Sequence, residues 1–584
     1  WASLAEAWWP ETAENDWDLG GFIWTGFDYR GEPTPFKWPN ISSHFGILDV
    51  CGFPKNVAYY YKSWWSKEDV LHISPHWNWP DKEGEMIKVW VNSNADEVEL
   101  FLNGHSFGKK TMPCNSHLNW DVVYEPGTRE AIGWRDGREI RAKVETTGPA
   151  VNVACLVHKT TMVADGQDAT VINVRLVDQH GRTIPDANNL IKFSLDGPGR
   201  ILGVGNGDPS SHEPDVCLDG NWQRHLFNGY CQVIVQAGTE PGPLSFTATS
   251  EGLWPESNGI HLVSPDSLLS YNPPVFHPDS VKVTGQAKIL GADISFLPQL
   301  EAQGMTFSDN GKPGDPLAIM KAHGFNWIRL RIFNNPENEK GYAPGEGWCD
   351  LGNTLKMAKR IKAQGMKFLL DFHYSDFWAD PGKQYKPKSW EGLEYPALRE
   401  ALKQYTQRVV AALDEQGTLP DMVQIGNEIN HGMVWPDGHV WHMDQLAGLI
   451  QAGIDGVYAV DSTVQIMLHM ALGGQHDETV MWFDQMLARE IQFDILGLSF
   501  YPRWHGELAD LKHNISKLIT RYPYPINIVE YSHMKEEVND IAFKEFTDRV
   551  NGTFIWEPLS TWEKIFDRDG KSNRFMEIYD QYLQ

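Results

Sequence analysis

The stretch KFLLDFH at residues 367–373 is a short apolar run that ends in two polar side chains, Asp371 and His373. Runs of this kind recur to the end of the sequence, and helical patterns such as DLGNTLKMAKRIKAQG (350–365) fill most of the gaps between them. The other runs are ILGADIS (289–295), WIRLRIF (327–333), MVQIGNE (422–428), QIMLHMA (465–471), FDILGLSF (493–500), PINIVEY (525–531) and TFIWEP (553–558). Eight short strands that alternate with helices predict a (β/α)8 TIM barrel, complete within residues 287–584.

Two glutamates stand at the ends of predicted strands in this barrel. The fourth strand ends in Asn427-Glu428, and the seventh ends in Glu530. The carboxyl ends of barrel strands are where catalytic residues lie, so both glutamates are expected at one mouth. Glycoside hydrolysis needs such a pair, because one carboxyl group must donate a proton while the other, ionised, attacks the anomeric carbon. A lone Glu at a strand end is commonly a structural ion-pair partner; the pair favours catalysis.

Other strand ends carry residues that fit the same chemistry. Arg331 and Tyr501 are expected to donate hydrogen bonds that keep the strand-seven carboxylate ionised. Asn427 is expected to bind the sugar 2-hydroxyl, and Trp556 to form a platform beneath the reacting sugar. Structural alternatives stay open: Arg331 as a plain salt-bridge residue, His373 as a satisfied core histidine and Trp556 as core packing.

Composition limits the partners of the chain. Its formal net charge is −27, and an acidic chain without a Lys/Arg cluster argues against nucleic acid and anionic lipid. The sequence has no apolar run of about 18 residues, so no membrane span is predicted. The six cysteines form no C-x-x-C pair, which argues against a zinc site. A bridge between Cys217 and Cys231 and free buried thiols are both left open.

The chain before the barrel has a different pattern. Short runs alternate between apolar and polar residues and are separated by turn residues, which predicts two β-sandwich (Ig-like) domains at residues 67–148 and 149–263. The clearest runs are IKVWVNS (87–93), VELFLNG (98–104), TVINVRLVD (170–178) and CQVIVQAG (231–238). A stretch rich in Pro and Ser without periodicity follows and predicts a linker at residues 264–286.

The barrel resembles a known family in several long stretches. DFHYSDFWADPGKQYKPKSW (371–390) is similar to the signature of arabinogalactan endo-β-1,4-galactanases, glycoside hydrolase family 53. The resemblance covers about residues 287–584 and is also carried by GADISFLPQLEAQG (291–304), RLRIFNNP (329–336), QIGNEINHGMVWP (424–436) and VEYS (529–532). It implies a retaining enzyme that cleaves β-1,4-galactan, a side chain of pectin, from within.

By this resemblance Glu428 is the acid/base and Glu530 the nucleophile. The residues expected to bind substrate are Arg331, Asp371, His373, Trp378, Asn427, Tyr501 and Trp556. Phe377 stands where the family signature usually has Thr. Bacterial members often bind calcium in a long loop after strand seven, but here only about twenty residues, mostly helical in pattern, separate Ser532 from strand eight. No metal and no other cofactor is therefore expected.

Two other readings of the barrel are kept. Many barrels share glutamates on strands four and seven, so the substrate is open to another β-linked chain such as a mannan or a glucan. A non-catalytic glycan-binding protein is a third reading, disfavoured because both glutamates are present. Export from the cell, as a secreted, periplasmic or cell-surface protein, is expected from a polymeric substrate alone.

Residues 1–66 resemble the barrel end of family 2 β-galactosidases. The resemblance is carried by WASLAEAWW (1–9), GGFIWTGFDYRGEPTPFKWPNISSHFGILD (20–49) and YYYKSWW (59–65). It implies that GGFIWTGFD (20–28) is the eighth strand of another TIM barrel, with Trp24 lining its site, and that the two sandwiches are C-terminal modules of that family. Both catalytic glutamates of that family precede this strand. Residues 1–66 are therefore expected to be an inactive remnant, and the parent to be a fusion of an exo-β-galactosidase with an endo-galactanase.

Overall fold

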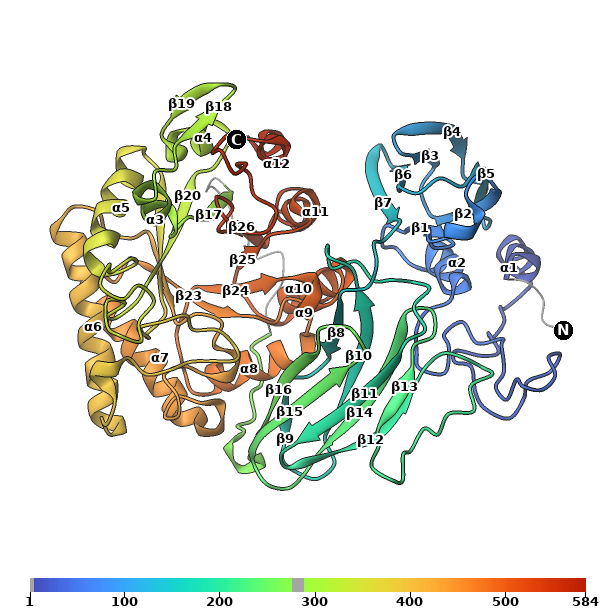
Figure 1. Cartoon of the computed structure of the whole chain (residues 1–584), viewed down its shortest axis with the longest axis horizontal. Helices are drawn as coiled ribbons and strands as arrows, with labels where there is room; N and C mark the ends of the chain where they lie inside the picture. The colour runs from blue at the N-terminus through green and yellow to red at the C-terminus, as the bar shows by residue number, and fades with distance from the viewer. Residues whose placement is uncertain (1–4, 276–287, 584) are drawn as a thin grey trace. The chain divides into compact units, whose positions relative to one another are not determined.

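The computed structural model describes residues 5–275 and 288–583. Contacts divide the chain into two compact units (Figure 1). The first comprises Trp1–Val157, Ala169–Gln236 and Ser245–Asn258, and the second comprises His158–Asp168, Ala237–Leu244 and Gly259–Gln584. The predicted linker extends into residues 276–286, which lie outside the described residues.

The second unit contains a closed barrel of eight parallel strands. In order around the ring they are β17 (Ile289–Asp293), β20 (Trp327–Ile332), β21 (Lys367–Phe372), β22 (Met422–Ile425), β23 (Gln465–Met470), β24 (Ile495–Phe500), β25 (Ile526–Tyr531) and β26 (Val550–Trp556). The pairing of β17 with β26, from Ile289 opposite Gly552 to Asp293 opposite Trp556, closes the ring. The prediction of a complete TIM barrel is confirmed, and closure leaves none of these strands with an unpaired edge.

Helices follow most of the strands, and Figure 1 shows α5, α6 and α7 outside the ring. The longer ones are α5 (Leu351–Ala363), α6 (Tyr395–Glu415), α7 (Met443–Tyr458), α8 (His476–Ala488) and α10 (Leu508–Arg521). The predicted helix at 350–365 is α5, whose N-cap residue Asp350 accepts a hydrogen bond from the Asn353 amide at 2.7 Å. In the described parts of the chain, no helix combines the length and apolarity needed to cross a bilayer.

Each barrel strand is buried on both faces, which explains its continuous apolar run. Inside the ring, every strand contributes one residue to one apolar cluster: Ile289, Trp327, Leu369, Met422, Met467, Ile495, Val529 and Phe554. The outward side chains, such as Leu290, Ile328 and Val423, pack against the helices in the main core. Asn527 of β25 is a buried polar side chain against Met422 and Met467 of this cluster, and the polar residues of the predicted site lie towards the carboxyl ends of the strands.

The predicted sandwiches are present. The first has sheets β1-β2-β5 and β4-β3-β6-β7, built from β1 (Leu71–Ser74), β2 (Met86–Ser93), β3 (Glu97–Leu102), β4 (His105–Thr111), β5 (Leu118–Val123), β6 (Thr128–Arg135) and β7 (Arg138–Glu145). One apolar core, including Val89, Leu100 and Trp120, joins the two sheets.

The second sandwich has a four-stranded sheet, β12-β14-β10-β8, and a five-stranded sheet, β13-β11-β15-β16-β9. Its strands are β8 (Asn152–Val157), β9 (Thr161–Val163), β10 (Ala169–Val177), β11 (Leu190–Asp196), β12 (Gly199–Gly205), β13 (Gln223–His225), β14 (Tyr230–Ala237), β15 (Gly242–Thr249) and β16 (Glu256–Val263). Cys217 and Cys231 are both free thiols, which settles the choice left open by the sequence.

The strand predicted at residues 20–28 is wrong. The described chain here has helices α1 (Ala5–Glu14) and α2 (Asn56–Trp65), and between them only isolated bridges such as that of Phe27 with Leu48. A barrel strand is held by hydrogen bonds to a neighbour on each side. In the part of the chain that the structure describes, no strand pairs with residues 20–26, and Phe22 and Trp24 are exposed.

Candidate active site

Glu428 and Glu530 lie at the carboxyl ends of β22 and β25, and both are buried, with exposed fractions of 9% and 5%. Glu530 belongs to its strand, whereas Glu428 follows a sharp bend. At the bend Gly426 has φ +80° and Glu428 has φ +48°. A Cβ at Gly426 would lie 2.6 Å from Cγ2 of Ile429, so glycine is required for the turn that aims Glu428.

Both carboxylate oxygens of Glu530 accept hydrogen bonds. Nη1 of Arg329 donates to Oε1 at 2.7 Å, and the hydroxyl of Tyr501 donates to Oε2 at 3.0 Å. Burial raises the pKa of Glu530, and the Arg329 guanidinium acts in the opposite direction. A buried carboxyl group with an arginine and a phenol as donors is arranged to act as the ionised member of the pair.

Glu428 has a different environment. Oγ of Ser499 donates to its Oε1 at 2.8 Å, and no cation forms an ion pair with it among the described residues. Burial, followed by the charge of Glu530, raises the pKa of Glu428 well above the ordinary range of a glutamate. Burial raises the pKa of both carboxyl groups, but only Glu530 is held by a cationic donor, and this difference fits an acid and a nucleophile.

Arg329 is the centre of the polar network. Its guanidinium contacts Asp293 at 3.1 Å, Asp371 at 2.9 Å, the Asn427 side chain at 2.8 Å and the Gln424 side chain at 3.2 Å, in addition to Glu530. It is 1% exposed. The prediction that Arg331 donates to Glu530 is wrong, because the donor is Arg329, two residues earlier on the same strand. Residues i and i+2 of a strand point to the same side, so the level at which neighbouring strands meet decides which arginine reaches Glu530.

Arg331 forms a second ion pair, above Arg329 on the same strand. Its Nη1 contacts Asp293 at 3.5 Å and hydrogen-bonds to Glu557. Its guanidinium stacks against the rings of Phe296 and Trp378, at 4.4 and 4.2 Å from their centroids. These contacts fit the alternative that Arg331 is a salt-bridge residue. Glu557, fully buried directly after Trp556, was missed by the sequence argument although it stands at the end of strand eight.

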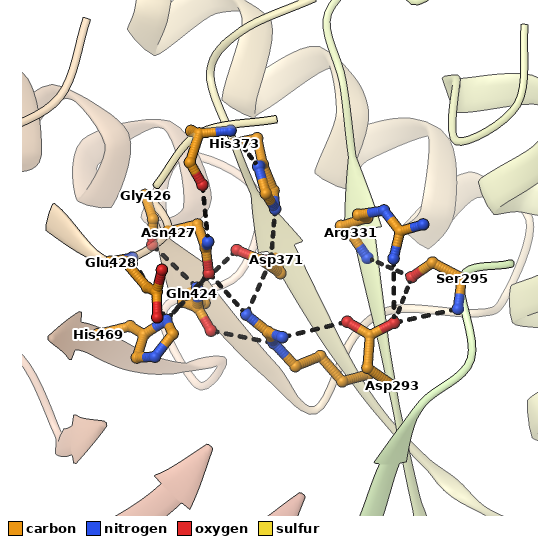
Figure 2. A network of polar contacts seen from close by, with 12 residues as sticks. Asp293, Ser295, Arg331, Asp371, His373, Gln424, Gly426, Asn427, Glu428 and His469 are labelled. Carbon is orange, nitrogen blue, oxygen red and sulfur yellow. Dashed lines mark hydrogen bonds and ion pairs between the residues drawn. The ribbon is translucent and has the colours of Figure 1, made fainter. Parts of the chain in front are cut away.

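Asp371 and His373 are both buried and belong to the polar network drawn in Figure 2. Asp371 accepts from Arg329, and from Nε2 of Gln424 at 2.6 Å. The ring of His373 contacts Asp371 through Nε2 at 3.1 Å, and its Nδ1 accepts from the Ala379 amide at 3.0 Å. Both ring nitrogens are therefore used within the protein, so the satisfied-histidine alternative fits His373.

Aromatic side chains and Asn427 complete the predicted set. Trp378 and Trp556 are partly exposed with ring centroids 6.0 Å apart. Trp562 is 47% exposed and packs on Trp556 and Tyr501 at 5.0 and 5.1 Å. The sequence argument missed Trp562, because it follows the last strand in an irregular segment. Exposed indole faces at the mouth of a barrel are suited to stacking on sugar rings.

Asn427 and His469 flank the acid. Asn427 accepts from Arg329 and donates to the Ala379 carbonyl at 2.9 Å. His469 of β23 contacts Ser499 through Nε2 at 2.8 Å, and burial lowers the pKa of its imidazole well below the ordinary value. Figure 2 shows His469 beside Glu428. The only sign of His469 in the sequence was that a histidine interrupts the apolar run QIMLHMA (465–471).

The arrangement places two carboxyl groups with different hydrogen-bond partners at a single barrel mouth, which fits acid-assisted displacement at an acetal carbon. The acidic residues near Glu530 surround the Arg329 cation. Within residues 5–275 and 288–583, no group of three or more His, Cys, Asp or Glu side chains is placed to hold a metal ion.

Family models match three parts of the chain. Residues 289–559 match glycosyl hydrolase family 53, and residues 154–258 match the family 2 C-terminal domain 5. Residues 84–141 match a domain of unknown function, DUF4982. The resemblance of the chain to both hydrolase families is confirmed.

Individual relatives agree with this division. A probable arabinogalactan endo-β-1,4-galactanase A of Aspergillus terreus is 34% identical over 306 residues, which are 46% of this chain and 85% of the relative. The β-galactosidase BoGH2A of Bacteroides ovatus is 44% identical over 41% of this chain, but the match spans only 28% of that enzyme. The solved family 53 catalytic domain of Ignisphaera aggregans is 31% identical, with a TM-score of 0.47 over 54% of this chain and all of that domain. Through its barrel, the chain belongs to glycosyl hydrolase family 53.

Proposed function

We propose that the barrel is a retaining endo-β-1,4-galactanase, with Glu428 as acid/base and Glu530 as nucleophile. One observation carries the proposal. Two buried glutamates share the barrel mouth, and one is held by Arg329 and Tyr501 while the other meets the hydroxyl of Ser499. This difference supports an ionised role for Glu530 and a protonated role for Glu428.

In the first step Oε of Glu530 attacks the anomeric carbon, and the bond to the leaving sugar oxygen breaks. Glu428 gives its proton to that oxygen, so the shortened chain leaves as an alcohol. Arg329 and Tyr501 hold the attacking carboxylate in a fixed orientation. Asn427 has its amide oxygen fixed by Arg329 and is proposed to donate its second amide hydrogen to the sugar 2-hydroxyl.

In the second step water replaces Glu530. Glu428, now ionised, takes a proton from the water while the water oxygen bonds to the anomeric carbon and the ester bond to Glu530 breaks. Two inversions give net retention. Both residues return to their starting protonation states, because Glu428 has regained the proton that it lost in the first step.

The substrate is a neutral polysaccharide, and the proposal names β-1,4-galactan. Supporting it are the galactanase relatives and the long stretch after strand three. Trp378, Trp556 and Trp562 present indole faces for the sugar units. A polysaccharide does not enter cells intact, and this supports a secreted, periplasmic or cell-surface location.

We also infer the domain division: a family 2 remnant at 1–66, sandwiches at 67–148 and 149–263, a linker at 264–286 and the galactanase at 287–584. In support, the strands of each sheet fall within one of these ranges. The remnant has no hydrolytic role by itself in this proposal. The B. ovatus relative is named a β-galactosidase, and that activity is not proposed for residues 1–66.

The test uses linear β-1,4-galactan and p-nitrophenyl β-galactoside with the native chain, Glu428→Ala, Glu530→Ala and Glu400→Ala. Glu400 is an exposed glutamate of α6 and serves as the matched control. Native chain and control are expected to shorten galactan to oligomers that first appear with β-configuration by NMR, and to leave the small galactoside intact.

Each active-site variant is expected to lose galactan cleavage. With an activated aryl galactobioside, azide is expected to rescue Glu428→Ala by giving a β-galactobiosyl azide, since the aryl group leaves without an acid and azide attacks the glycosyl-enzyme without a base. Cleavage of a mannan or a glucan instead of galactan would refute the substrate. No cleavage by a folded chain would favour a glycan-binding protein.

A further inference from the structure

Three neighbouring strands place a short hydrogen-bonded chain behind Glu428. Glu428 follows β22, His469 lies in β23 and Ser499 lies in β24. Oγ of Ser499 is 2.8 Å from Oε1 of Glu428 and 2.8 Å from Nε2 of His469. Ser499 and His469 are fully buried, so bulk water does not substitute for either contact. Ser499 has one hydrogen, and it points either to Glu428 or to His469.

The other ring nitrogen decides that direction. Nδ1 of His469 faces two N–H donors, Nε2 of Gln424 at 3.1 Å and the backbone amide of Glu428 at 3.4 Å. It also faces Oδ1 of Asn427 at 3.0 Å, an oxygen that already accepts from Nη2 of Arg329 at 2.8 Å. Among the described residues the Glu428 amide has Nδ1 as its acceptor, so this amide is satisfied only if Nδ1 carries no hydrogen.

Nδ1 is therefore the acceptor, and the imidazole hydrogen is on Nε2. Nε2–H then donates to Ser499 Oγ, and the serine hydrogen is left for Glu428. The opposite tautomer would turn the serine hydrogen towards His469 and leave the amide of Glu428 without an acceptor. Each group in the chain is satisfied only in the first arrangement.

We propose that His469 and Ser499 are positioning residues of the acid/base, and that they hold Glu428 by a hydrogen bond which strengthens when its carboxylate forms. This inference rests on the proposed function. A retaining enzyme needs Glu428 protonated in the first step and ionised in the second. In the glycosyl-enzyme Glu530 is an uncharged ester, so its repulsion of Glu428 is gone, and the Ser499 hydroxyl stabilises the carboxylate that activates water.

The charges around Glu428 and His469 agree with these proposed roles. Acidic neighbours and burial oppose ionisation of Glu428, while Ser499 and Arg329 favour it. The groups whose charges bear on Glu428 are Glu530, Asp380 and Arg329, and those that bear on His469 are Arg329, His373 and His505. Burial first, and then Arg329, lower the pKa of His469 well below its usual value, so the imidazole stays neutral and its Nδ1 stays free to accept.

The test compares the pH profiles of Ser499→Ala and Ser499→Thr with an activated substrate, 2,4-dinitrophenyl β-galactobioside. Dinitrophenolate leaves without a proton, so kcat reports the second step, which needs ionised Glu428. Loss of the hydroxyl is expected to move the acidic limb of kcat upward by on the order of one pH unit. The limb is expected to stay in place in Ser499→Thr, and kcat/KM for this substrate to change little in both variants.

A second pair tests His469 independently of Ser499. The amide nitrogen of Gln reaches the position of Nε2 and donates in the same direction, so His469→Gln is expected to keep the native profile. His469→Leu removes the donor and is expected to shift the limb as Ser499→Ala does. The control is Thr406→Val, which removes a buried hydroxyl of α6 that contacts Tyr374 after β21, and it should leave the profile unchanged.

An acidic limb that stays in place or moves downward in Ser499→Ala overturns the proposal, since a downward shift means that Ser499 accepts from Glu428. If Ser499→Ala does not fold, the two His469 variants decide in the same way. A native chain that leaves galactan intact, or a Glu428→Ala variant with native kinetics, refutes the proposed function instead. The two failures are therefore distinguishable.

Discussion

At the scale of single residues, the two glutamate carboxyl groups of the site differ in their hydrogen-bond partners. The carboxylate of Glu530 accepts hydrogen bonds from Arg329 and Tyr501, whereas within the described residues the carboxyl group of Glu428 accepts only from the hydroxyl of Ser499. Burial works against ionisation of both. The cost of burying an acid without a cation is therefore concentrated on Glu428, and it appears as a pH dependence of stability.

Glu428→Gln is expected to stabilise the barrel in a pH-dependent way. The pKa of Glu428 is higher in the folded than in the unfolded protein, so its favourable contribution is complete at low pH and is lost as pH rises through the folded value. The variant has an uncharged amide at this position, so it does not lose stability in this way as pH rises. Calorimetry between pH 4 and 8 should show equal melting temperatures at the acidic end and a variant that melts a few degrees higher at the alkaline end. A parallel offset at every pH would contradict this reasoning; Glu400→Gln is the exposed control.

Arg329→Met is expected to lower kcat/KM for galactan by about 100- to 1,000-fold, because the nucleophile loses a charged donor. It should also destabilise the barrel by about 3–5 kcal/mol, because Asp293 and Asp371 are left as buried charges. Arg360→Met, which breaks a partly exposed ion pair with Glu301, should cost under about 1 kcal/mol and leave activity intact. Equal effects of the two changes in kinetics and denaturant titration would refute the central place of Arg329.

At the scale of elements, strand β22 ends in a bend that the sequence G-N-E makes possible. Gly426 and Glu428 both adopt positive φ, and the short helical turn Ile429–His431 follows at once. The bend turns the glutamate out of the strand pattern and towards Ser499 of β24. A residue with a Cβ at position 426 would be strained by its backbone and would also meet Ile429.

Gly426→Ala is therefore expected to reduce kcat by about 10- to 100-fold, because a displacement of about 1 Å at a catalytic group is costly. The matched control is Gly417→Ala. Gly417 has φ +76°, but its added Cβ would meet nothing within 4 Å, and it follows α6 away from the site. Both variants should lose about 1–2 kcal/mol of stability, and only Gly426→Ala should lose activity. Full activity of Gly426→Ala would show that the bend does not aim Glu428.

At the scale of the whole molecule, the catalytic machinery lies within one closed ring. Among the described residues, the side chains that hydrogen-bond to the carboxyl groups of Glu428 and Glu530 come from β20, β24 and the residue directly after β24. The ring is completed by β17 and β26, the first and last strands of the barrel sequence. Because every strand is paired on both sides, the barrel requires no strand from residues 1–263.

Residues 264–584 expressed alone are consequently expected to cleave galactan with a kcat/KM within about threefold of the whole chain, since no residue of the site is removed. Residues 1–263 expressed alone should release nothing from galactan or from p-nitrophenyl β-galactoside. The measurement is reducing-end release at matched molar concentrations, with folding checked by circular dichroism. A folded but inactive barrel would show that the front half contributes to the site.

The sequence by itself determined the elements and the two glutamates. Apolar runs of strand length, helical periodicity and the residue at each strand end are local properties, so eight strands, α5, Glu428 and Glu530 were predicted before any contact was known. The tertiary structure alone decided which partner meets which carboxyl group. Arg329 and Arg331 share one side of one strand, and only the stagger of the closed ring brings the first to Glu530 and the second to Glu557. The roles proposed for His469 and Ser499 also depend on contacts between neighbouring strands, which the sequence does not show. The error at residues 20–28 has the same cause, because a strand needs partners that its own sequence cannot supply.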